Sequence, residues 1–197
     1  MELIVIRHGL PAATAGDPDR RLSTVGRRQA AAMAARLRTE PIDAVYVSPL
    51  RRARQTAAPL EAALGHTAVV HDGLAEWDRD ADAYVPVEEL RAAGDERWAA
   101  MVAGDLAALG VDVGAFRSRV LDAVDVIVAT HPGERVAVVC HGGVINAVTA
   151  DVLGLDRLLW FEPAYASITR VLAGRGGRRA LRTVNDAAHL ETPGPRR

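Results

Sequence analysis

The chain has 197 residues, of which 49% are hydrophobic, and a formal net charge of −1. This length and composition predict one soluble globular domain over residues 1–197, with a core large enough to fold by itself. All 24 basic residues are arginine, and the lack of lysine excludes phosphate-loop NTPases and enzymes that form a Schiff base. The near-zero net charge argues against a general polyanion binder, so no nucleic-acid partner is expected.

The cysteine content and the distribution of apolar residues bear on the cellular compartment. The single cysteine, Cys140, cannot form an internal disulfide or a zinc cluster. No apolar run approaches the roughly 20 residues that a membrane-spanning helix needs, so no membrane partner is expected. The chain opens directly into a strand pattern, without the leader that marks a secreted protein. These features predict a cytoplasmic protein.

Apolar runs and amphipathic stretches alternate along the chain, which predicts strands alternating with helices. Strands are expected at residues 3–9, 42–50, 67–74 and 135–143, followed by a hairpin of residues 166–173 and 178–186. Helices are expected at residues 22–40, 51–64, 115–131 and 144–155. Ser23 is the expected N-cap of the first helix, and Gly154 is expected to end the last. The order predicts a three-layer α/β/α fold with a mostly parallel central sheet and a C-terminal hairpin.

Residues from about 75 to 113 break this alternation. They contain acidic patches, three large aromatic side chains and a helix expected to start near Pro86. We interpret the segment as a small insertion, a lid, that follows the third strand and lies over the sheet. Trp77, Tyr84 and Trp98 either line the entrance to a site with apolar surface or pack the lid onto the domain.

Two of the predicted strands end in the same way. Arg7, His8 and Gly9 follow one apolar run, and His141 follows another that ends at Cys140. The carboxyl ends of parallel strands meet at one edge of a sheet. If the two strands are neighbours, the two histidines lie about one strand spacing apart, ~5 Å. A single histidine here often caps a turn, but two at equivalent strand ends indicate a binding site.

A third candidate element is the segment SPLRRARQTA at residues 48–57, where a strand gives way to a helix. The amides and partial positive charge of a helix N-terminus suit an anion, and arginine adds a planar fork that matches phosphate oxygens. Arg51, Arg52 and Arg54 cannot all point inward, because neighbouring helical positions face different ways. One of these arginines, with Arg7 and the two histidines, forms a pocket that fits a phosphoryl group.

The segments RHG, SPLRRARQTA, LAE and CHGG occur in this order across nearly the whole chain. With these four segments the sequence resembles the histidine phosphatase superfamily, also called phosphoglycerate mutase-like, and its phosphatase branch in particular. The resemblance implies that His8 of RHG is the nucleophile. It also implies that Arg7 and Arg52 clamp the phosphate.

The resemblance assigns roles to three further residues. His141 belongs to both the catalytic and the phosphate-binding set, and Gly142 beside it is phosphate-binding. Glu76, in the setting Leu-Ala-Glu, is similar to the proton donor of the family. Three nearby acids remain alternatives for that role: Asp78, Asp80 and Asp82.

The expected activity is hydrolysis of a phosphate monoester of a small metabolite through a phosphohistidine at His8, with no metal and no cofactor. Leu10 and Pro11 follow RHG, where many mutases of the superfamily have an acidic residue and then Ser or Thr, and the chain is shorter than typical mutases. Hydrolysis is therefore favoured over a phosphoglycerate mutase-type phosphotransferase. A phosphate-ligand-binding pseudo-enzyme is a second alternative, although His8 and Glu76 are both present. The substrate and the oligomeric state stay open, a homodimer being one option.

Other patterns in the sequence each lack a required part. Four acids occupy positions one, three, five and twelve of a calcium-loop template: Asp78, Asp80, Asp82 and Glu89. Ala83 stands where that template needs glycine, and the Asp-x-Asp pattern does not follow an apolar strand as in aspartyl-phosphate enzymes. A cysteine-dependent phosphatase would need arginine six residues after Cys140, where Asn146 stands. The glycines and arginines of residues 174–179 lack the interleaved aromatic residues of RNA-binding segments and suit a hairpin turn.

Overall fold

The structure is a computed structural model that describes residues 1–14, 16–79, 85–174 and 176–190. Its centre is a six-stranded sheet in the order β3-β2-β4-β1-β5-β6, in which the first four strands pair in parallel and β5 pairs antiparallel with both β1 and β6. The strands are β1 (Glu2–Arg7), β2 (Ala44–Val47), β3 (Val69–Val70), β4 (Arg135–Cys140), β5 (Ile168–Ala173) and β6 (Arg179–Asp186). The expected mostly parallel sheet with a C-terminal hairpin is confirmed.

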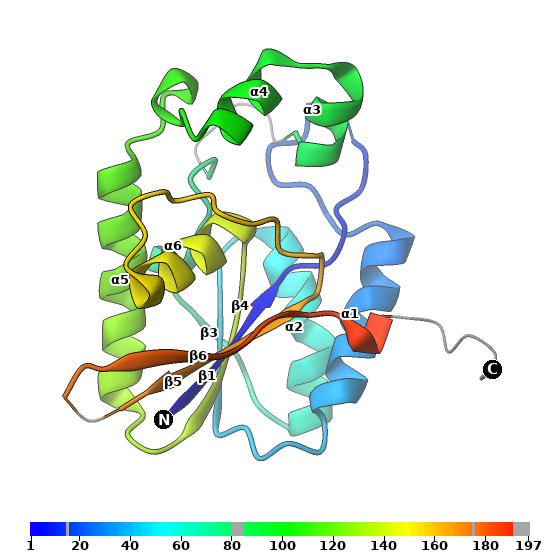
Figure 1. Cartoon of the computed structure of the whole chain (residues 1–197). Coiled ribbons are helices and arrows are strands. Elements are labelled where there is room, and N and C mark those ends of the chain that lie inside the picture. The colour runs from blue at the N-terminus through cyan, green and yellow to red at the C-terminus, as the bar shows by residue number, and fades with distance from the viewer. Residues whose placement is uncertain (15, 80–84, 175, 191–197) are drawn as a thin grey trace, which may run out of the picture.

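Helices cover both faces of the sheet, so the fold has three layers (Figure 1). The α-helices are α1 (Thr24–Leu37), α2 (Arg51–Leu64), α3 (Val87–Ala93), α4 (Glu96–Ala103), α5 (Val113–Thr130) and α6 (Gly142–Leu153). Short 3-10 helices are η1 (Asp72–Leu74), η2 (Ala107–Leu109) and η3 (Ala188–Leu190). Helices α1 and α2 pack on one face, whereas α5 and α6 pack on the other.

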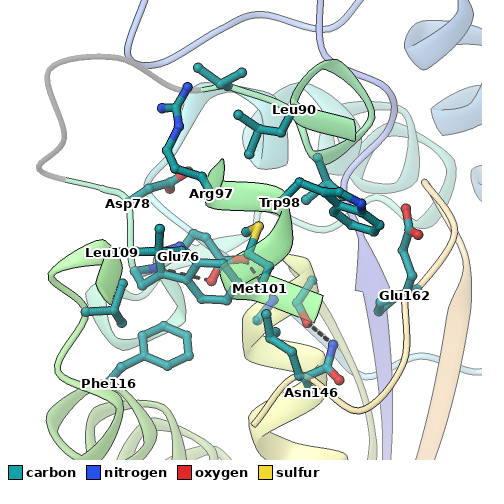
Figure 2. A pocket seen from close by; sticks show the side chains of 18 of the residues that line it. Glu76, Asp78, Leu90, Arg97, Trp98, Met101, Leu109, Phe116, Asn146 and Glu162 are labelled. Carbon is teal, nitrogen blue, oxygen red and sulfur yellow. Dashed lines mark hydrogen bonds between the residues drawn. The ribbon is translucent and has the colours of Figure 1, made fainter. Parts of the chain in front are cut away.

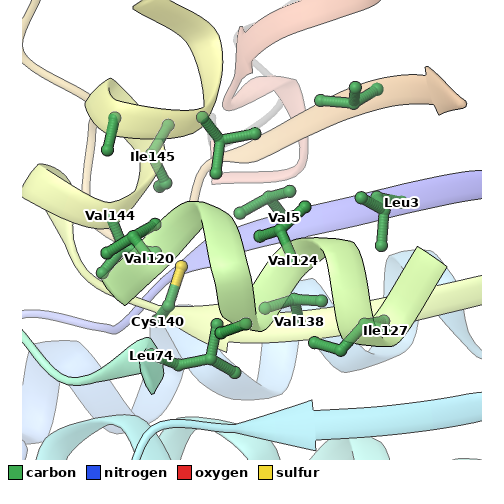
Figure 3. Close-up of a cluster of buried hydrophobic side chains, with 14 of the residues drawn as sticks. Leu3, Val5, Leu74, Val120, Val124, Ile127, Val138, Cys140, Val144 and Ile145 are labelled. Carbon is green, nitrogen blue, oxygen red and sulfur yellow. The ribbon is translucent and has the colours of Figure 1, made fainter. Parts of the chain in front are cut away.

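Strand β1 is buried on both faces because it lies in the middle of these layers. Leu3 and Val5 point toward α5 and α6, and Ile4 and Ile6 belong to the cluster beneath α1 and α2, as the two-residue period of a strand requires (Figure 3). The apolar run predicted as a strand thus contributes to both halves of the core.

The ends of several helices follow from local chemistry. Ser23 caps α1 by accepting a hydrogen bond from the amide of Gly26, as predicted. Gly154 ends α6 in the left-handed conformation with φ of 67°, also as predicted. Helix α6 begins at Gly142, two residues before the predicted start. The third strand is much shorter than expected, because residues 72–74 form the 3-10 helix η1 instead.

The insertion after β3 lies above the carboxyl edge of the sheet (Figure 1). Pro86 is the N-cap of α3, near the predicted position. A second helix, α4, was not predicted. Its eight residues are bounded by the cap residue Asp95 and by Gly104 in the left-handed conformation, and none of its side chains is fully buried.

Candidate active site

His8 and His141 lie side by side at the carboxyl edge of the sheet. Strands β1 and β4 pair in parallel with Arg7 opposite Cys140, so the residues that follow them are also neighbours. The two imidazole ring centroids are 5.0 Å apart, which confirms the expected proximity. Both side chains are buried, and the amide of His8 donates to the carbonyl oxygen of Cys140 (2.9 Å).

The protonation of His8 follows from one contact. Its Nδ1 lies 2.8 Å from the carbonyl oxygen of Gly9. Because a carbonyl oxygen only accepts, Nδ1 carries the proton and Nε2 of the neutral ring keeps its lone pair. Burial, and then the positive charges of Arg52 and Arg7, lower the pKa of His8 well below 6.5. The ring is therefore neutral at ordinary pH, with the lone pair available on Nε2.

Two buried arginines flank this ring. Arg7 is 6% exposed, lies with its Cζ 3.9 Å from the centroid of the Tyr165 ring and donates through Nη1 to the carbonyl oxygen of Pro163. Its Nε has no hydrogen-bond partner among the described residues. Arg52 is 1% exposed, and its Nη2 donates to Asp78 Oδ1 at 3.2 Å. Two buried guanidinium groups in one cavity suit an anion with several oxygens.

A threonine side chain connects the start of α2, which carries Arg52, to the loop after β1. Thr56, one turn further along α2, donates its hydroxyl hydrogen to the carbonyl oxygen of Arg52 (2.8 Å). The same hydroxyl oxygen accepts a hydrogen bond from the amide of Gly9 (2.9 Å). The hydroxyl therefore joins the two segments that carry the predicted nucleophile and the predicted clamp.

His141 is fully buried, and its Nε2 lies 2.7 Å from Ser48 Oγ. Its Nδ1 is also buried and has no partner among the described residues. Burial, followed by the positive charge of Arg52, lowers the pKa of this histidine well below 6.5. A buried polar atom without a partner costs about 1–3 kcal/mol, so these orphaned atoms indicate a polar ligand.

The carboxylate of Glu76 is held by two backbone amides. Its Oε2 accepts from Gly143 at the start of α6 (2.8 Å), and its Oε1 accepts from Trp77 (3.1 Å). Burial and the neighbouring carboxylate of Asp78 raise the pKa of Glu76 to about 7, although the two amides oppose this shift. A carboxyl with this pKa can both give and take a proton near neutral pH.

The alternative acids differ from Glu76 in their surroundings. Asp78 faces Arg52, and burial raises its pKa while that guanidinium opposes the shift. Asp80 and Asp82 lie outside the described residues. Among the described acids, Glu76 lies against the start of α6, beside His141.

The two glycines that open α6 meet different surroundings. A Cβ added to Gly143 would lie 2.0 Å from Trp77 Cζ3 and 2.3 Å from Glu76 Oε1, whereas one added to Gly142 would meet only Arg7, at 3.7 Å from Nε. Sequence analysis named Gly142 alone. The structure shows that Gly143 is the glycine that allows the Glu76 loop to approach the helix.

This difference gives a matched pair of substitutions. We expect Gly143→Ala to lower the free energy of unfolding by about 1–3 kcal/mol, because the rigid Trp77 ring must move away. Gly142→Ala should leave stability unchanged or raise it slightly, since alanine is the better helix former. Urea denaturation of both variants checks this, and equal stability of the two would contradict the proposed close approach.

Five of the six predicted site residues line one cavity of about 1060 Å³: Arg7, His8, Arg52, Glu76 and Gly142. Figure 2 labels Glu76 in this cavity. The lid and the loop before β5 supply its upper walls. His141 lies beneath, with its ring against that of His8.

The sequence left open whether the three aromatic residues of the insertion line the site or pack the lid onto the domain, and the structure describes two of them. Trp77 packs onto the domain with its ring centroid 5.6 Å from that of Phe116. Trp98 lines the cavity from α4. Tyr84 lies outside the described residues.

The remaining sequence patterns have structural explanations. Glu89 pairs with the buried Arg20 (2.7 Å), and no group of three His, Cys, Asp or Glu side chains in the described ranges is arranged to hold a metal ion. Burial raises the pKa of Cys140, which belongs to the core cluster beneath α5. None of the described helices is both long and apolar enough to span a membrane.

Several residues of the site were not found from the sequence. Arg119 of α5 donates to the carbonyl oxygens of Gly73 and Ala75 (both 3.0 Å) and so holds the loop that carries Glu76. The ring of Tyr165 stacks against the guanidinium group of Arg7, and its centroid lies 5.5 Å from that of the His8 ring. Ser48 at the end of β2 could have been noticed, because it occupies a strand end like the two histidines. Arg119 and Tyr165 carry no local signal.

The chain is similar in sequence to several known proteins. A probable phosphatase of Schizosaccharomyces pombe is 28% identical over 210 residues, which cover 98% of this chain and 96% of the relative. A metal-independent phosphoserine phosphatase of Arabidopsis thaliana is 31% identical over 159 residues, 75% of this chain and 66% of the relative. Two further relatives carry phosphoglycerate mutase in their names.

Solved structures share the fold. A phosphoserine phosphatase variant from Entamoeba histolytica, in complex with phosphoserine, superposes with a TM-score of 0.78 over 96% of this chain and 99% of that chain, at 22% identity. A family model described as the histidine phosphatase superfamily (branch 1) matches residues 3–187. The chain therefore belongs to the histidine phosphatase superfamily.

Proposed function

We propose that this protein is a metal-independent phosphate monoester hydrolase that acts through a phosphohistidine at His8. The observation that carries the proposal is the hydrogen bond from His8 Nδ1 to the carbonyl oxygen of Gly9, which leaves the lone pair on Nε2 of a neutral ring. This ring lies in a cavity that two buried arginines also line. A nucleophile among fixed positive groups suits attack on a phosphoryl group.

The reaction would proceed in two displacements. His8 Nε2 attacks phosphorus in line, the bond from phosphorus to the ester oxygen breaks, and Glu76 gives its proton to the leaving alcohol. Water then attacks the phosphohistidine, Glu76 takes back a proton, and the phosphorus–nitrogen bond breaks. The products are the free alcohol and inorganic phosphate, and the enzyme returns to its starting state.

Fixed charges would supply most of the rate acceleration. Arg7, Arg52 and the unpartnered Nδ1 of His141 are candidates to bind the phosphoryl oxygens, with Gly142 leaving room beside Arg7. Asp78 accepts a hydrogen bond from Arg52 (3.2 Å). A phosphate group would therefore compete with that carboxylate for the guanidinium.

The test is turnover of 4-nitrophenyl phosphate by protein treated with excess chelator. We expect full activity, equal amounts of nitrophenol and inorganic phosphate, and a phosphoenzyme that survives an alkaline quench but not an acid one, as a phosphorus–nitrogen bond does. A histidine phosphate forms because the first displacement leaves the phosphoryl group on the ring.

Two outcomes would contradict the proposal. Loss of turnover in chelator, restored by a divalent cation, would point to metal-assisted chemistry. Nitrophenol released in excess of inorganic phosphate when a phosphoglycerate is added as acceptor would point to phosphotransfer of the mutase type.

A further inference from the structure

The cavity is much larger than a phosphoryl group requires, and its upper part differs in chemistry from its floor. The phosphate end contains buried arginines and histidine, but the walls above it are lined by side chains of the insertion and of the loop before β5 (Figure 2). Many of these are apolar: Leu90, Trp98, Met101, Leu109 and Phe161. This part of the cavity lies where the alcohol portion of a phosphate ester would extend.

Helix α4 presents an apolar face that the protein leaves partly uncovered. Trp98 and Met101 are three positions apart, so they share one face of the helix, and both line the cavity. Met101 packs partly against the core cluster beneath α5, but among the described residues Trp98 belongs to neither core cluster. An apolar helix face of this kind ordinarily covers a hydrophobic core. Here it faces the cavity above the phosphate end.

The arginines of this upper part already form hydrogen bonds or ion pairs within the protein. Beyond Arg7 and Arg52, the described residues that line the cavity include four arginines: Arg79, Arg97, Arg119 and Arg157. Arg97 makes a two-pronged pair with Asp95 (2.9 and 2.8 Å), and Arg157 donates through Nε to the carbonyl oxygen of Leu159 (2.8 Å). Arg119 is bound to the carbonyl oxygens of the Glu76 loop, and Arg79 pairs with Asp72.

Negative charges in the same walls offset these arginines. Four carboxylates line the cavity above or beside the phosphate end: Asp78, Glu96, Asp112 and Glu162. Residues 80–84, outside the described ranges, contain no arginine or lysine. A second anionic group on a substrate would therefore have to displace existing hydrogen bonds of these arginines and would also meet several carboxylates.

We propose that the natural substrate, given the hydrolase function proposed above, is the phosphate monoester of an uncharged alcohol that carries an aromatic or branched apolar group. This group lies against Trp98 and Met101 and completes the apolar face of α4. Substrates with a carboxylate or a second phosphate, such as phosphoglycerates and nucleoside polyphosphates, are disfavoured by the same walls. Trp98 is then a specificity-determining residue rather than a catalytic one.

The test compares three para-substituted phenyl phosphates with similar leaving groups and different side chains. The substituents are propyl, 2-carboxyethyl and 2-aminoethyl, which are apolar, anionic and cationic. We expect kcat/KM to be at least about tenfold higher for the propyl ester than for the carboxyethyl ester, mostly through KM. The aminoethyl ester should also fall below the propyl ester, because its ammonium group loses water without gaining an apolar contact.

Substitutions at Trp98 give a second readout. Trp98→Ala should remove most of the preference for the propyl ester over the carboxyethyl ester, because the apolar contact with the indole ring is lost. Trp98→Arg should raise kcat/KM for the carboxyethyl ester, since it places a cation in the wall. Val126→Ala is the matched control, because Val126 is an exposed apolar side chain of α5 away from the cavity.

The outcomes separate this inference from the proposed function. If phenyl phosphate itself is not hydrolysed, the hydrolase proposal fails. If phenyl phosphate is hydrolysed but the carboxyethyl or the aminoethyl ester equals or exceeds the propyl ester, the apolar-alcohol proposal is wrong and the hydrolase stands. Unchanged selectivity in Trp98→Ala would also overturn the role given to Trp98.

Discussion

His8→Ala is expected to abolish turnover of 4-nitrophenyl phosphate. No other described side chain in the cavity combines a neutral nitrogen lone pair with a place between Arg7 and Arg52, so no group can replace the nucleophile. Removal of the nucleophile in a serine protease lowers kcat by about 10⁶-fold, and we expect a loss of at least about 10⁴-fold here. Steady-state kinetics in the presence of chelator measures the effect.

Phosphate binding provides the control for folding of this variant. The variant keeps Arg7, Arg52 and His141, so its affinity for inorganic phosphate should stay within about tenfold of the unmodified protein. His66→Ala is the matched histidine variant, because His66 follows the far end of α2 and binds the carbonyl oxygen of Ile42 (2.8 Å). It should retain full activity. Turnover by His8→Ala at a rate close to the unmodified protein would remove the assignment of the nucleophile.

Such a comparison also addresses the pseudo-enzyme alternative. An unmodified protein that binds phosphate tightly and turns over none of the tested esters would be a ligand-binding protein. Activity that disappears only in the His8 variant, with binding retained, would instead show that the site performs chemistry.

Glu76→Gln is expected to lower kcat by about 10²–10⁴-fold for esters of poorly acidic alcohols. Glutamine keeps the size of the side chain but cannot give a proton to the leaving oxygen. The loss should be much smaller for 4-nitrophenyl phosphate, because nitrophenolate leaves without protonation. Kinetics with an alkyl phosphate and 4-nitrophenyl phosphate, measured on both proteins, checks this difference.

The pH dependence gives an independent check on Glu76. Its pKa is raised to about 7, so the carboxyl holds a proton below that pH and loses it above. The first displacement needs the protonated form, so activity of the unmodified protein should fall above about pH 7. Lowered pKa values keep His8 and His141 neutral well below pH 6.5, so neither histidine should cause a fall of activity near that pH.

Measuring the pH dependence of both the unmodified protein and Glu76→Gln isolates the ionisation of Glu76. The substrate's own phosphate ionises near pH 6 in both experiments, so it cancels in the ratio of their rates. The rate of the unmodified protein divided by that of Glu76→Gln should fall by about tenfold for each pH unit above 7, because a decreasing fraction of the unmodified protein keeps the proton. A ratio that is constant from pH 5 to pH 9 would exclude Glu76 as the proton donor and leave Asp78 as the next residue to substitute.

The sequence alone was sufficient for the sheet, for four α-helices at close to their observed positions and for the start of α3. Strongly apolar runs such as Leu3–Ile6 form strands wherever they are buried on both faces, and Ser23 caps its helix through a local hydrogen bond. The sequence was also sufficient to predict that His8 and His141 lie at the same edge of the sheet, since parallel strands have their carboxyl ends there. The strands and caps depend on short-range pattern, whereas the pairing of β1 with β4, which makes the two histidines neighbours, came from the tertiary structure.

Other features of the site depend on contacts between distant segments, and only the tertiary structure decided them. The pKa of Glu76 is raised because the fold buries it beside Asp78 and against the start of α6, and Arg119 holds its loop from α5. Tyr165 reaches Arg7 from a loop before β5. Helix α4 was missed because it spans only eight residues, which are too few for its apolar face to be recognised as a periodic pattern in the sequence. Burial and charge at the site are sums over the whole fold, and a local sequence pattern does not contain them.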